Sequence, residues 1–237
     1  MTTQQIRISG KNLGQLALPD FCARCFWLKM RCQERLPYQT FPGIFSSIDS
    51  YTKKITGLHF AEHKHIPRWF DGFGKLGEPI DVPHHSVFRI VDTATNILLT
   101  GVPDEVFKRP DGSLFIVDDK TARLSDHQDH LLPMYVTQLN AYALIAEQTG
   151  LGGVTGLGLV YHEPQTDIVG DAVDSVCGDD GFTMRFVAKL LPIELRPSMI
   201  PPLLQKVREI CDRPSAPAGR TGCEDCERVE RLVEAAG

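Results

Sequence analysis

The sequence contains no long hydrophobic run, no excess of positive charge and no repeated or low-complexity tract. Because a membrane-spanning helix needs about 18 or more largely apolar residues, we expect no membrane span. The first ten residues, MTTQQIRISG, lack the apolar segment of a secretory signal, so we expect a cytoplasmic protein. The 25 Lys and Arg residues against 30 Asp and Glu residues give a net charge of −5, which does not favour nucleic-acid binding overall but leaves room for a local basic surface.

The length and the order of the predicted elements indicate the fold class. The 237 residues suffice for one sizeable core, and we predict one domain over residues 1–237. Residues 1–19 carry little pattern, and Asp20 is a candidate N-cap for the first helix. Periodicity predicts helices over 21–35, 44–63, 133–148, 201–211 and at the end of the chain, and strands over 87–94, 97–109, 113–120, 155–162, 168–176 and 182–190. This order predicts an α/β fold with one mixed central β-sheet flanked by helices.

Charged residues occur at the end of an otherwise apolar hairpin. Pro110 and Gly112 predict the turn between its two strands. Because strand side chains alternate, Asp118 and Lys120 share one face with Leu114 and Ile116, and Asp119 shares the other face with Phe115 and Val117. Burying such charges costs several kcal/mol unless they are paired or bind a metal. On this pattern a strand-end salt bridge and a functional site are equally good interpretations.

The functional interpretation is a divalent-cation site. Asp104 on the first strand and Asp118 on the second supply the oxygen ligands that Mg²⁺ or Mn²⁺ prefers. Lys120 can orient or deprotonate a water molecule beside the ion, or stabilise charge that develops on a phosphate.

Cysteine is the second candidate ligand type. The chain has seven cysteines, which in a reducing compartment are better metal ligands than disulfide partners. Two C-x-x-C pairs lie near opposite ends of the chain: Cys22 and Cys25, and Cys223 and Cys226. Two such pairs can complete a tetrahedral thiolate site. The alternative is that the first pair consists of small buried residues on an amphipathic helix.

The combined motifs resemble a known family. Gly101-Val102-Pro103-Asp104, then Asp118-Asp119-Lys120, then Gln138 and Tyr142 four residues apart on a helix resemble the PD-(D/E)XK nuclease superfamily. More narrowly they are similar to its RecB-like branch, which includes CRISPR-associated exonucleases and the nuclease domains of helicase–nucleases. The resemblance is good over residues 97–145 and weaker beyond them. It implies a restriction-endonuclease-like core and metal-dependent hydrolysis of phosphodiester bonds.

The resemblance also implies residue roles. Asp104 and Asp118 would be side-chain ligands of the divalent metal, and the backbone carbonyl of Asp119 would add a third ligand. Lys120 would be the catalytic lysine. Gln138 and Tyr142 would position that lysine and the nucleic acid.

One expected ligand is missing from the pattern. Many members of the family place a histidine or an acid on an early helix as a further metal ligand. The helix predicted over 44–63 has no histidine at the matching position, and Asp49 is the substitute that we predict there.

The family also offers an interpretation of the cysteines. Several RecB-like nucleases clamp their termini around a four-cysteine [4Fe–4S] cluster, here implying contact between residues 20–35 and 199–237. The usual arrangement is one early and three late cysteines, whereas this chain has two and two, so zinc remains an alternative. Cys32 and Cys211 are possible substitute ligands, and we interpret Cys177 as structural.

The predicted function is that of an exonuclease that hydrolyses DNA that is single-stranded or has free ends, in repair, recombination or CRISPR-type defence. The clamp would bring together basic residues from both ends of the chain, with scattered solvated charges as the alternative: Arg24, Lys29, Arg31, Arg35, Arg185, Lys189, Arg196, Lys206, Arg208 and Arg213. Exposed aromatic residues would stack on bases, unless they are simply buried: Trp27, Tyr38 and Trp69. The rival hypotheses are a non-catalytic DNA- or protein-binding module with a nuclease fold, and an iron–sulfur redox protein.

Overall fold

The computed structural model describes residues 4–32, 43–124, 130–167, 170 and 173–237. Its centre is a four-stranded sheet with the order β4 (Glu105–Lys108), β5 (Leu114–Lys120), β6 (Val154–Pro164) and β9 (Phe186–Ile193). The pairs β4–β5 and β6–β9 are antiparallel, and β5–β6 is parallel. The predicted mixed central sheet is therefore confirmed.

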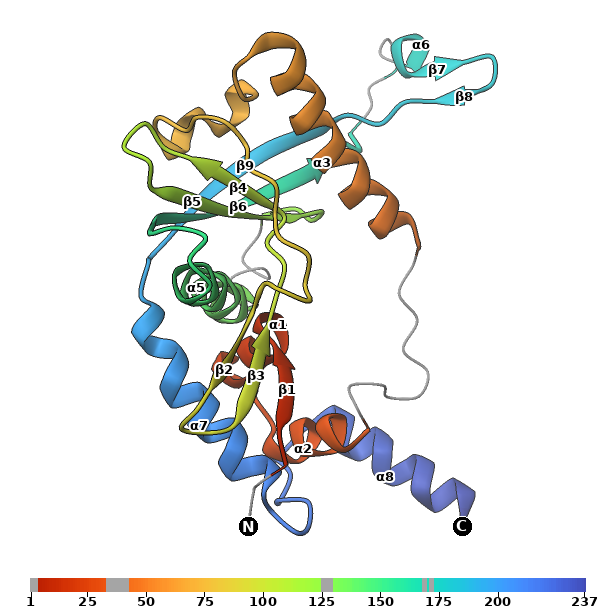
Figure 1. The fold of residues 1–237 in the computed structure, drawn as a ribbon. Coiled ribbons are helices and arrows are strands. Elements are labelled where there is room, and N and C mark those ends of the chain that lie inside the picture. The colour runs from red at the N-terminus through yellow and green to blue at the C-terminus, as the bar shows by residue number, and fades with distance from the viewer. Residues whose placement is uncertain (1–3, 33–42, 125–129, 168–169, 171–172) are drawn as a thin grey trace.

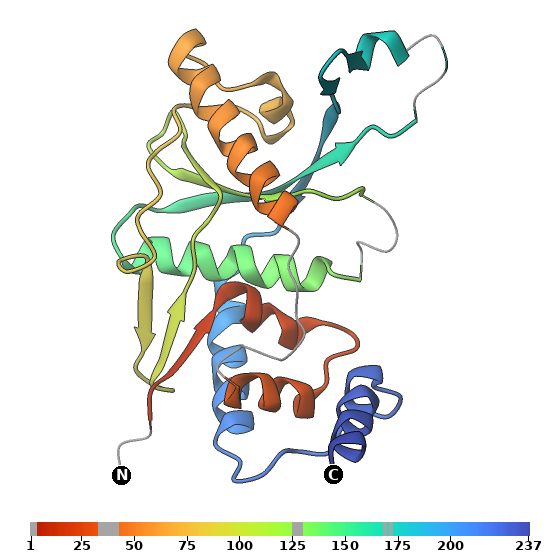
Figure 2. The same cartoon turned by 90° about the vertical axis from the view of Figure 1, so that its right-hand side faces the viewer.

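Helices cover both faces of this sheet. The long helix α3 (Gly43–His63) and the short 3-10 helix η2 (Arg68–Phe73) lie on one side, and α5 (Leu132–Gln148) lies against the other (Figures 1 and 2). The predicted bounds of α3 and α5 are correct to within one residue. Gly150, with φ of 75°, follows the end of α5 in the left-handed conformation that glycine favours after a helix.

A second, smaller sheet corrects one predicted strand. It has the order β1 (Ile6–Ser9), β3 (Ile97–Thr100) and β2 (Arg89–Asp92), with β1 parallel and β2 antiparallel to β3. The predicted strand over 97–109 is wrong as one element, because the chain leaves β3 at Gly101 and joins the other sheet only at Glu105. Pro103 lies in this break and has no N–H for a sheet hydrogen bond. The break lets Asp104 lie between the two sheets.

The N-terminal part holds elements that sequence periodicity missed. After β1 come α1 (Gly10–Gly14) and the 3-10 helix η1 (Gln15–Ala17), followed by α2 (Ala23–Arg31). The N-cap of α2 is Cys22, so the prediction of Asp20 at that position is wrong. Asp20 instead lies 3.2 Å from the ring of His130.

The C-terminal part contains a small projecting arm and two helices. The arm consists of α6 (Val173–Val176), β7 (Cys177–Gly178) and β8 (Gly181–Phe182), and it stands away from the central sheet in Figure 1. After β9 come the 3-10 helix η4 (Pro197–Met199), α7 (Ile200–Cys211) and α8 (Glu224–Ala236). The described part of the predicted strand over 168–176 is thus mainly helical. Arg35 and Tyr38 lie outside the described residues.

Strand β5 separates two hydrophobic clusters. Leu114 and Ile116 pack into the larger cluster with α5, whereas Phe115 and Val117 pack into a smaller one with Phe70 and Phe73 of η2. The predicted alternation along β5 is therefore confirmed. Because both faces of the strand are buried, the side chains of Asp118 and Asp119, which point to opposite faces at its end, are buried as well.

The hairpin turn is also confirmed. Gly112 has φ of 84°, and its N–H donates to the Arg109 carbonyl at 2.9 Å. Among the helices of the described residues, none is both long enough and apolar enough to cross a membrane.

Candidate active site and cysteine centre

The end of β5 places an acid and a lysine together beside α5. Asp118 is almost completely buried and forms an ion pair with Lys120, which is on the same face of the strand. Burial raises the pKa of Asp118 to about 7, although Lys120 works in the opposite direction. Burial lowers the pKa of Lys120, but the combined attraction of Asp118 and Asp104 raises it above its ordinary value. The predicted pair therefore exists, and its acid titrates near neutral pH.

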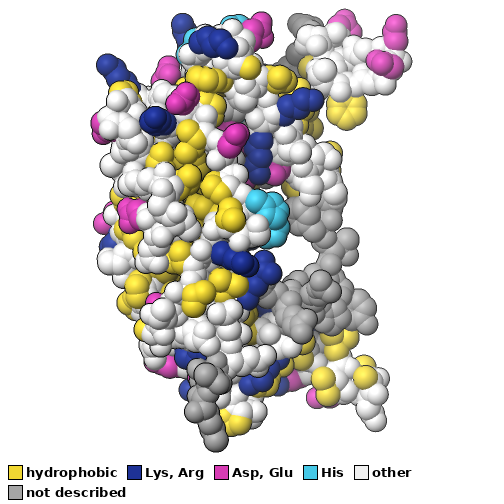
Figure 3. Space-filling model, viewed as in Figure 1, with side chains coloured by type: hydrophobic (Ala, Val, Ile, Leu, Met, Phe, Trp, Pro, Cys, Tyr) yellow, Lys and Arg dark blue, Asp and Glu magenta, His cyan; other side chains and the backbone are white. Residues whose placement is uncertain are grey.

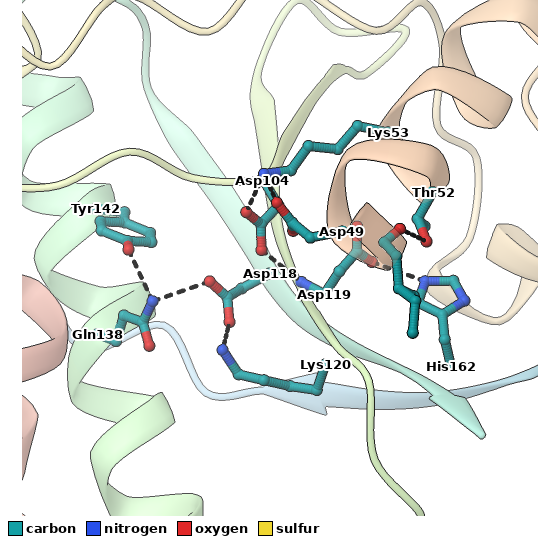
Figure 4. A network of polar contacts seen from close by, with 11 residues as sticks. Asp49, Thr52, Lys53, Asp104, Asp118, Asp119, Lys120, Gln138, Tyr142 and His162 are labelled. Atoms are coloured by element: carbon teal, nitrogen blue, oxygen red, sulfur yellow. Dashed lines mark hydrogen bonds and ion pairs between the residues drawn. The ribbon is translucent and has the colours of Figure 1, made fainter. Parts of the chain in front are cut away.

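Asp104 reaches this pair from the break between the two sheets. Its Oδ2 accepts a hydrogen bond from the backbone N–H of Asp119 at 2.8 Å, which fixes the loop to the end of β5. Asp104 has a side chain that is 16% exposed, so the site is open to solvent on the side of this acid. Asp104, Asp118 and the backbone of Asp119 thus come together as the sequence motifs predict (Figure 4).

Helix α3 contributes a cation that the sequence analysis missed. Lys53 Nζ lies 2.7 Å from Asp104 Oδ1 and 3.0 Å from Asp49 Oδ2. Asp49 therefore points toward the site, as Figure 4 shows, and is linked to Asp104 through the ammonium of Lys53. The helical spacing of Asp49 and Lys53, one turn apart, is the only sequence signal for this bridge.

Helix α5 holds Asp118 from the other side. Gln138 Nε2 donates to Asp118 Oδ1 at 2.9 Å and to the Tyr142 hydroxyl at 2.7 Å. Both residues are buried and lie one turn apart on the same face. Their amide and hydroxyl groups fix the orientation of the Asp118 carboxylate, which supports a positioning role.

Gly101 explains why the loop can approach α5. A Cβ atom at this position would lie 2.2 Å from Cε1 of Tyr142 and 2.6 Å from its Cδ1. Only a residue without a side chain leaves room for the tyrosine ring here. The first residue of the Gly101–Asp104 motif therefore has a steric role.

The opposite face of β5 carries a second polar cluster. Asp119 Oδ1 lies 3.1 Å from Nε2 of His162 on β6, and both side chains are buried. Glu105, the first residue of β4, is buried close by, and burial together with the nearby Asp119 raises its pKa well above the ordinary value. Sequence analysis missed Glu105 and His162, although the alternation of β6 places His162 on the same face as the core residue Val160.

The site has the donors for a hard divalent cation. Asp104 and Asp118 offer carboxylate oxygens. Asp104 is paired with Lys53 of α3, and Asp118 with Lys120 of its own strand. Such oxygen-rich surroundings fit Mg²⁺ or Mn²⁺.

The cysteines form a separate group at the other end of the molecule. The four Sγ atoms of Cys22, Cys25, Cys223 and Cys226 all lie within 4.8 Å of one another, and they are the one such candidate metal-binding group among the described residues. Each pair begins a helix: Cys22 is the N-cap of α2 and Cys223 the N-cap of α8. The predicted contact between the two terminal segments is thus present, and the site can hold a metal ion.

The surroundings act differently on the individual cysteines: they favour a thiolate at Cys22, whereas burial raises the pKa of Cys25 and Cys226. The backbone N–H of Arg220 donates to Cys22 Sγ at 3.3 Å. Burial opposes ionisation of Cys22, but this hydrogen bond and the neighbouring groups lower its pKa to about 6. The predicted substitutes Cys32 and Cys211 are not part of the group, and Cys177 is exposed on the projecting arm.

Two of the predicted basic residues have structural partners. Arg24 pairs with Glu230 at 2.6 Å, and Arg208 is buried with hydrogen bonds to the carbonyls of Gln4, Thr95 and Asn96. On the face shown in Figure 3, Lys and Arg side chains lie in separate groups with Asp and Glu among them. A continuous basic strip is therefore not present on that face.

Comparison with known proteins identifies the family. The model of the PD-(D/E)XK nuclease superfamily matches residues 39–231, which include every candidate residue of the acidic site, so the chain belongs to this superfamily. The crystal structure of SSO0001 is similar, with 13% identity, a TM-score of 0.38, and coverage of 89% of this chain and 79% of that one. No curated protein matches the chain.

Proposed function

We propose that the chain is a Mg²⁺- or Mn²⁺-dependent deoxyribonuclease of the RecB-like branch. The observation that carries this proposal is the convergence of Asp104, Asp118 and Lys120 from a loop and a strand end onto one site. Superfamily membership supports nuclease chemistry, and the order of the motifs along the chain supports the narrower branch.

The proposed site residues have distinct roles in hydrolysis. Asp104, Asp118 and the Asp119 carbonyl would hold the divalent ion, with Asp49 on α3 as a further ligand. When bound, the ion supplies positive charge that stabilises the phosphoryl oxygens and the leaving oxygen. Lys120 orients the attacking water and stabilises negative charge on the phosphate. Gln138 and Tyr142 keep the Asp118 carboxylate in place.

The proposed substrate is DNA with unpaired nucleotides, either single-stranded or at an end. A groove of about 750 Å³ lies between α3 and β9, on the same side of the sheet as His162. Tyr51, Trp69 and Phe186 line it together with Arg185, and Tyr51 is 66% exposed. Aromatic side chains next to a cation suit stacked bases and a phosphate backbone. Thr52, the neighbour of Lys53 on α3, and His162, which contacts Asp119, also line the groove, so it borders residues adjacent to the acidic site.

The same proposal assigns a structural role to the cysteines. A metal held by both C-x-x-C pairs would tie α2 to α8 and thereby join the two terminal segments within the single domain that we propose. Participation in repair, recombination or CRISPR-type defence follows only from the RecB-like motifs and is part of this proposal.

The test compares cleavage of a single-stranded oligonucleotide by the parent protein and two variants. Asp118→Ala and Lys120→Ala should each abolish Mg²⁺- or Mn²⁺-dependent degradation while circular dichroism shows a folded protein. Lys108→Ala is the matched control, because this lysine is exposed on β4 and lies away from the site. Undiminished cleavage by both site variants would refute the assignment. DNA binding without cleavage by the metal-loaded parent protein would instead favour a non-catalytic binding module.

A further inference from the structure

The four cysteine sulfurs lie too close together for an iron–sulfur cluster. Three Sγ–Sγ separations are 3.4 Å (Cys25–Cys226), 3.5 Å (Cys22–Cys226) and 3.6 Å (Cys25–Cys223). All other pairs in the group are within 4.8 Å. The size of this sulfur tetrahedron can be compared with the size that each type of metal centre requires.

A single ion requires a small tetrahedron. With zinc–sulfur bonds of about 2.3 Å, the edge of a regular ZnS₄ tetrahedron is about 3.8 Å. The three short separations fall close to this edge. Three edges of the sulfur tetrahedron therefore match a single ion, and the other three stay within 4.8 Å.

An iron–sulfur cluster requires a larger sulfur tetrahedron than a single ion does. In a [4Fe–4S] centre each thiolate binds a different iron, and the thiolates point outward from the four corners. The sulfur tetrahedron is then longer on every edge than the single-ion tetrahedron by the full iron–iron distance. A two-iron cluster also places two pairs of thiolates on different irons and separates the pairs. The [4Fe–4S] centre that the family resemblance implies therefore does not fit the observed separations.

We propose that the cysteine centre binds one zinc ion, with all four positions filled by thiolates. This inference rests on the proposal that the cysteines bind a metal. The two-and-two arrangement of C-x-x-C pairs, each at the beginning of a helix, is typical of structural zinc sites. A site with four protein ligands has no open position, so its role is to hold α2 and α8 together.

The packing of α8 shows why its attachment to the rest of the protein would need the metal. Cys226 is the only residue of α8 that is buried, and the nearby hydrophobic cluster consists only of the cysteines. Outside the cysteines, Arg24 and Glu230 supply an ion pair between the two helices, and its acid is half exposed. An exposed pair of this kind contributes little, so attachment of α8 depends on the metal.

The test measures the metal content of the full chain purified without oxygen. We expect about one zinc per chain, no acid-labile sulfide, and no broad absorbance of iron–sulfur charge transfer. Refolding with Co²⁺ alone should give the visible bands of a tetrahedral tetrathiolate ion. Iron with sulfide would overturn the proposal, and one iron without sulfide would overturn the choice of zinc.

Variants separate the ligands from the other thiols. Cys226→Ser should lose the metal and make α8 sensitive to limited proteolysis, whereas Cys177→Ser, an exposed cysteine outside the group, should retain both metal and protection. If Cys226→Ser is insoluble, removal of the metal from the parent protein by a chelator should produce the same sensitivity in α8. Unchanged protection of α8 after metal loss would contradict the clamping role. These measurements do not depend on nuclease activity, so they fail independently of the proposed function.

Discussion

Lys53 of α3 places its ammonium 2.7 Å from the carboxylate of Asp104, a residue that the family motif assigns to metal binding. The same ammonium reaches Asp49 at 3.0 Å, and these two acids raise the pKa of Lys53 although burial works against them. A lysine that remains charged in this position neutralises the acids when no divalent ion is bound. Lys53 would therefore compete for Asp104 with the divalent ion that we propose.

This competition predicts tighter metal binding when Lys53 is replaced. Lys53→Met removes the ion pair that stabilises the metal-free state, so Mg²⁺ or Mn²⁺ should bind on the order of 5-fold more tightly, equivalent to ~1 kcal/mol. Isothermal titration calorimetry without DNA measures the change. Lys54→Met is the control, because Lys54 is exposed on the neighbouring position of α3 and should leave the affinity unchanged. Weaker binding by Lys53→Met would show that the lysine supports the metal site.

Metal binding should also depend on pH through Asp118. Burial raises the pKa of this acid to about 7, and the cation binds its carboxylate form. Apparent Mg²⁺ affinity should therefore rise by about tenfold per pH unit below neutrality and level off above it. Titrations at several pH values should show this slope in the parent protein, and Asp118→Asn should lose it. A parent protein with pH-independent affinity around neutrality would contradict the assignment.

The raised pKa of Asp118 also makes the folding stability of the metal-free protein depend on pH in a defined direction. The pKa of Asp118 is higher in the folded than in the unfolded chain, so the folded state retains a proton that the unfolded state releases. The stabilisation of the folded state by protonated Asp118 is therefore complete below the ordinary pKa of 3.8, and it is lost as the pH rises to about 7.

Gly101 gives a prediction about packing. In Gly101→Ala the new methyl group would collide with the ring of Tyr142 at 2.2 Å. Overpacking of this kind should lower the free energy of unfolding by ~1–3 kcal/mol, and displacement of Tyr142 should also reduce cleavage. Urea-induced unfolding measures the first effect. Gly57→Ala in α3 is the control, because no heavy atom lies within 4 Å of its new Cβ, and it should be neutral or stabilising. Equal stability of Gly101→Ala and the parent would refute the steric role.

Long periodic elements were predictable from the sequence. Helix α3 spans 21 residues and α5 spans 17, and each carries enough apolar repeats to define its bounds closely. The elements before α2 were missed because β1 has only four residues and α1 only five, which is too short for a period to emerge. The break after Thr100 was missed because Ile97–Leu99 and Val106–Phe107 are apolar, although Gly101 and Pro103 between them are residue types that interrupt a strand.

Some residues of the acidic site were also predictable from the sequence, and others were not. Asp118, Lys120, Gln138 and Tyr142 are related by local spacing along one strand and one helix, which sequence alone reveals. Lys53 and His162 contact elements that are distant in the chain, and the one-turn spacing of Asp49 and Lys53 is the only local signal for these contacts. Glu105 directly follows Asp104, but its burial near Asp119 depends on the pairing of β4 with β5. The size of the sulfur tetrahedron is a further example, because two C-x-x-C motifs predict ligands but not the distance between the pairs.

The position of the cysteine pairs has a consequence for how the protein is made. Cys25 and Cys223 are separated by 198 positions, yet their sulfurs lie 3.6 Å apart. On a ribosome, the first pair emerges while nearly all of the central sheet is still to be synthesised. Four-thiolate coordination can be completed only after the last pair has left the exit tunnel. Metal loading would therefore come late in biogenesis, and a nascent chain stalled before Cys223 would present two unprotected thiols to other metals and oxidants.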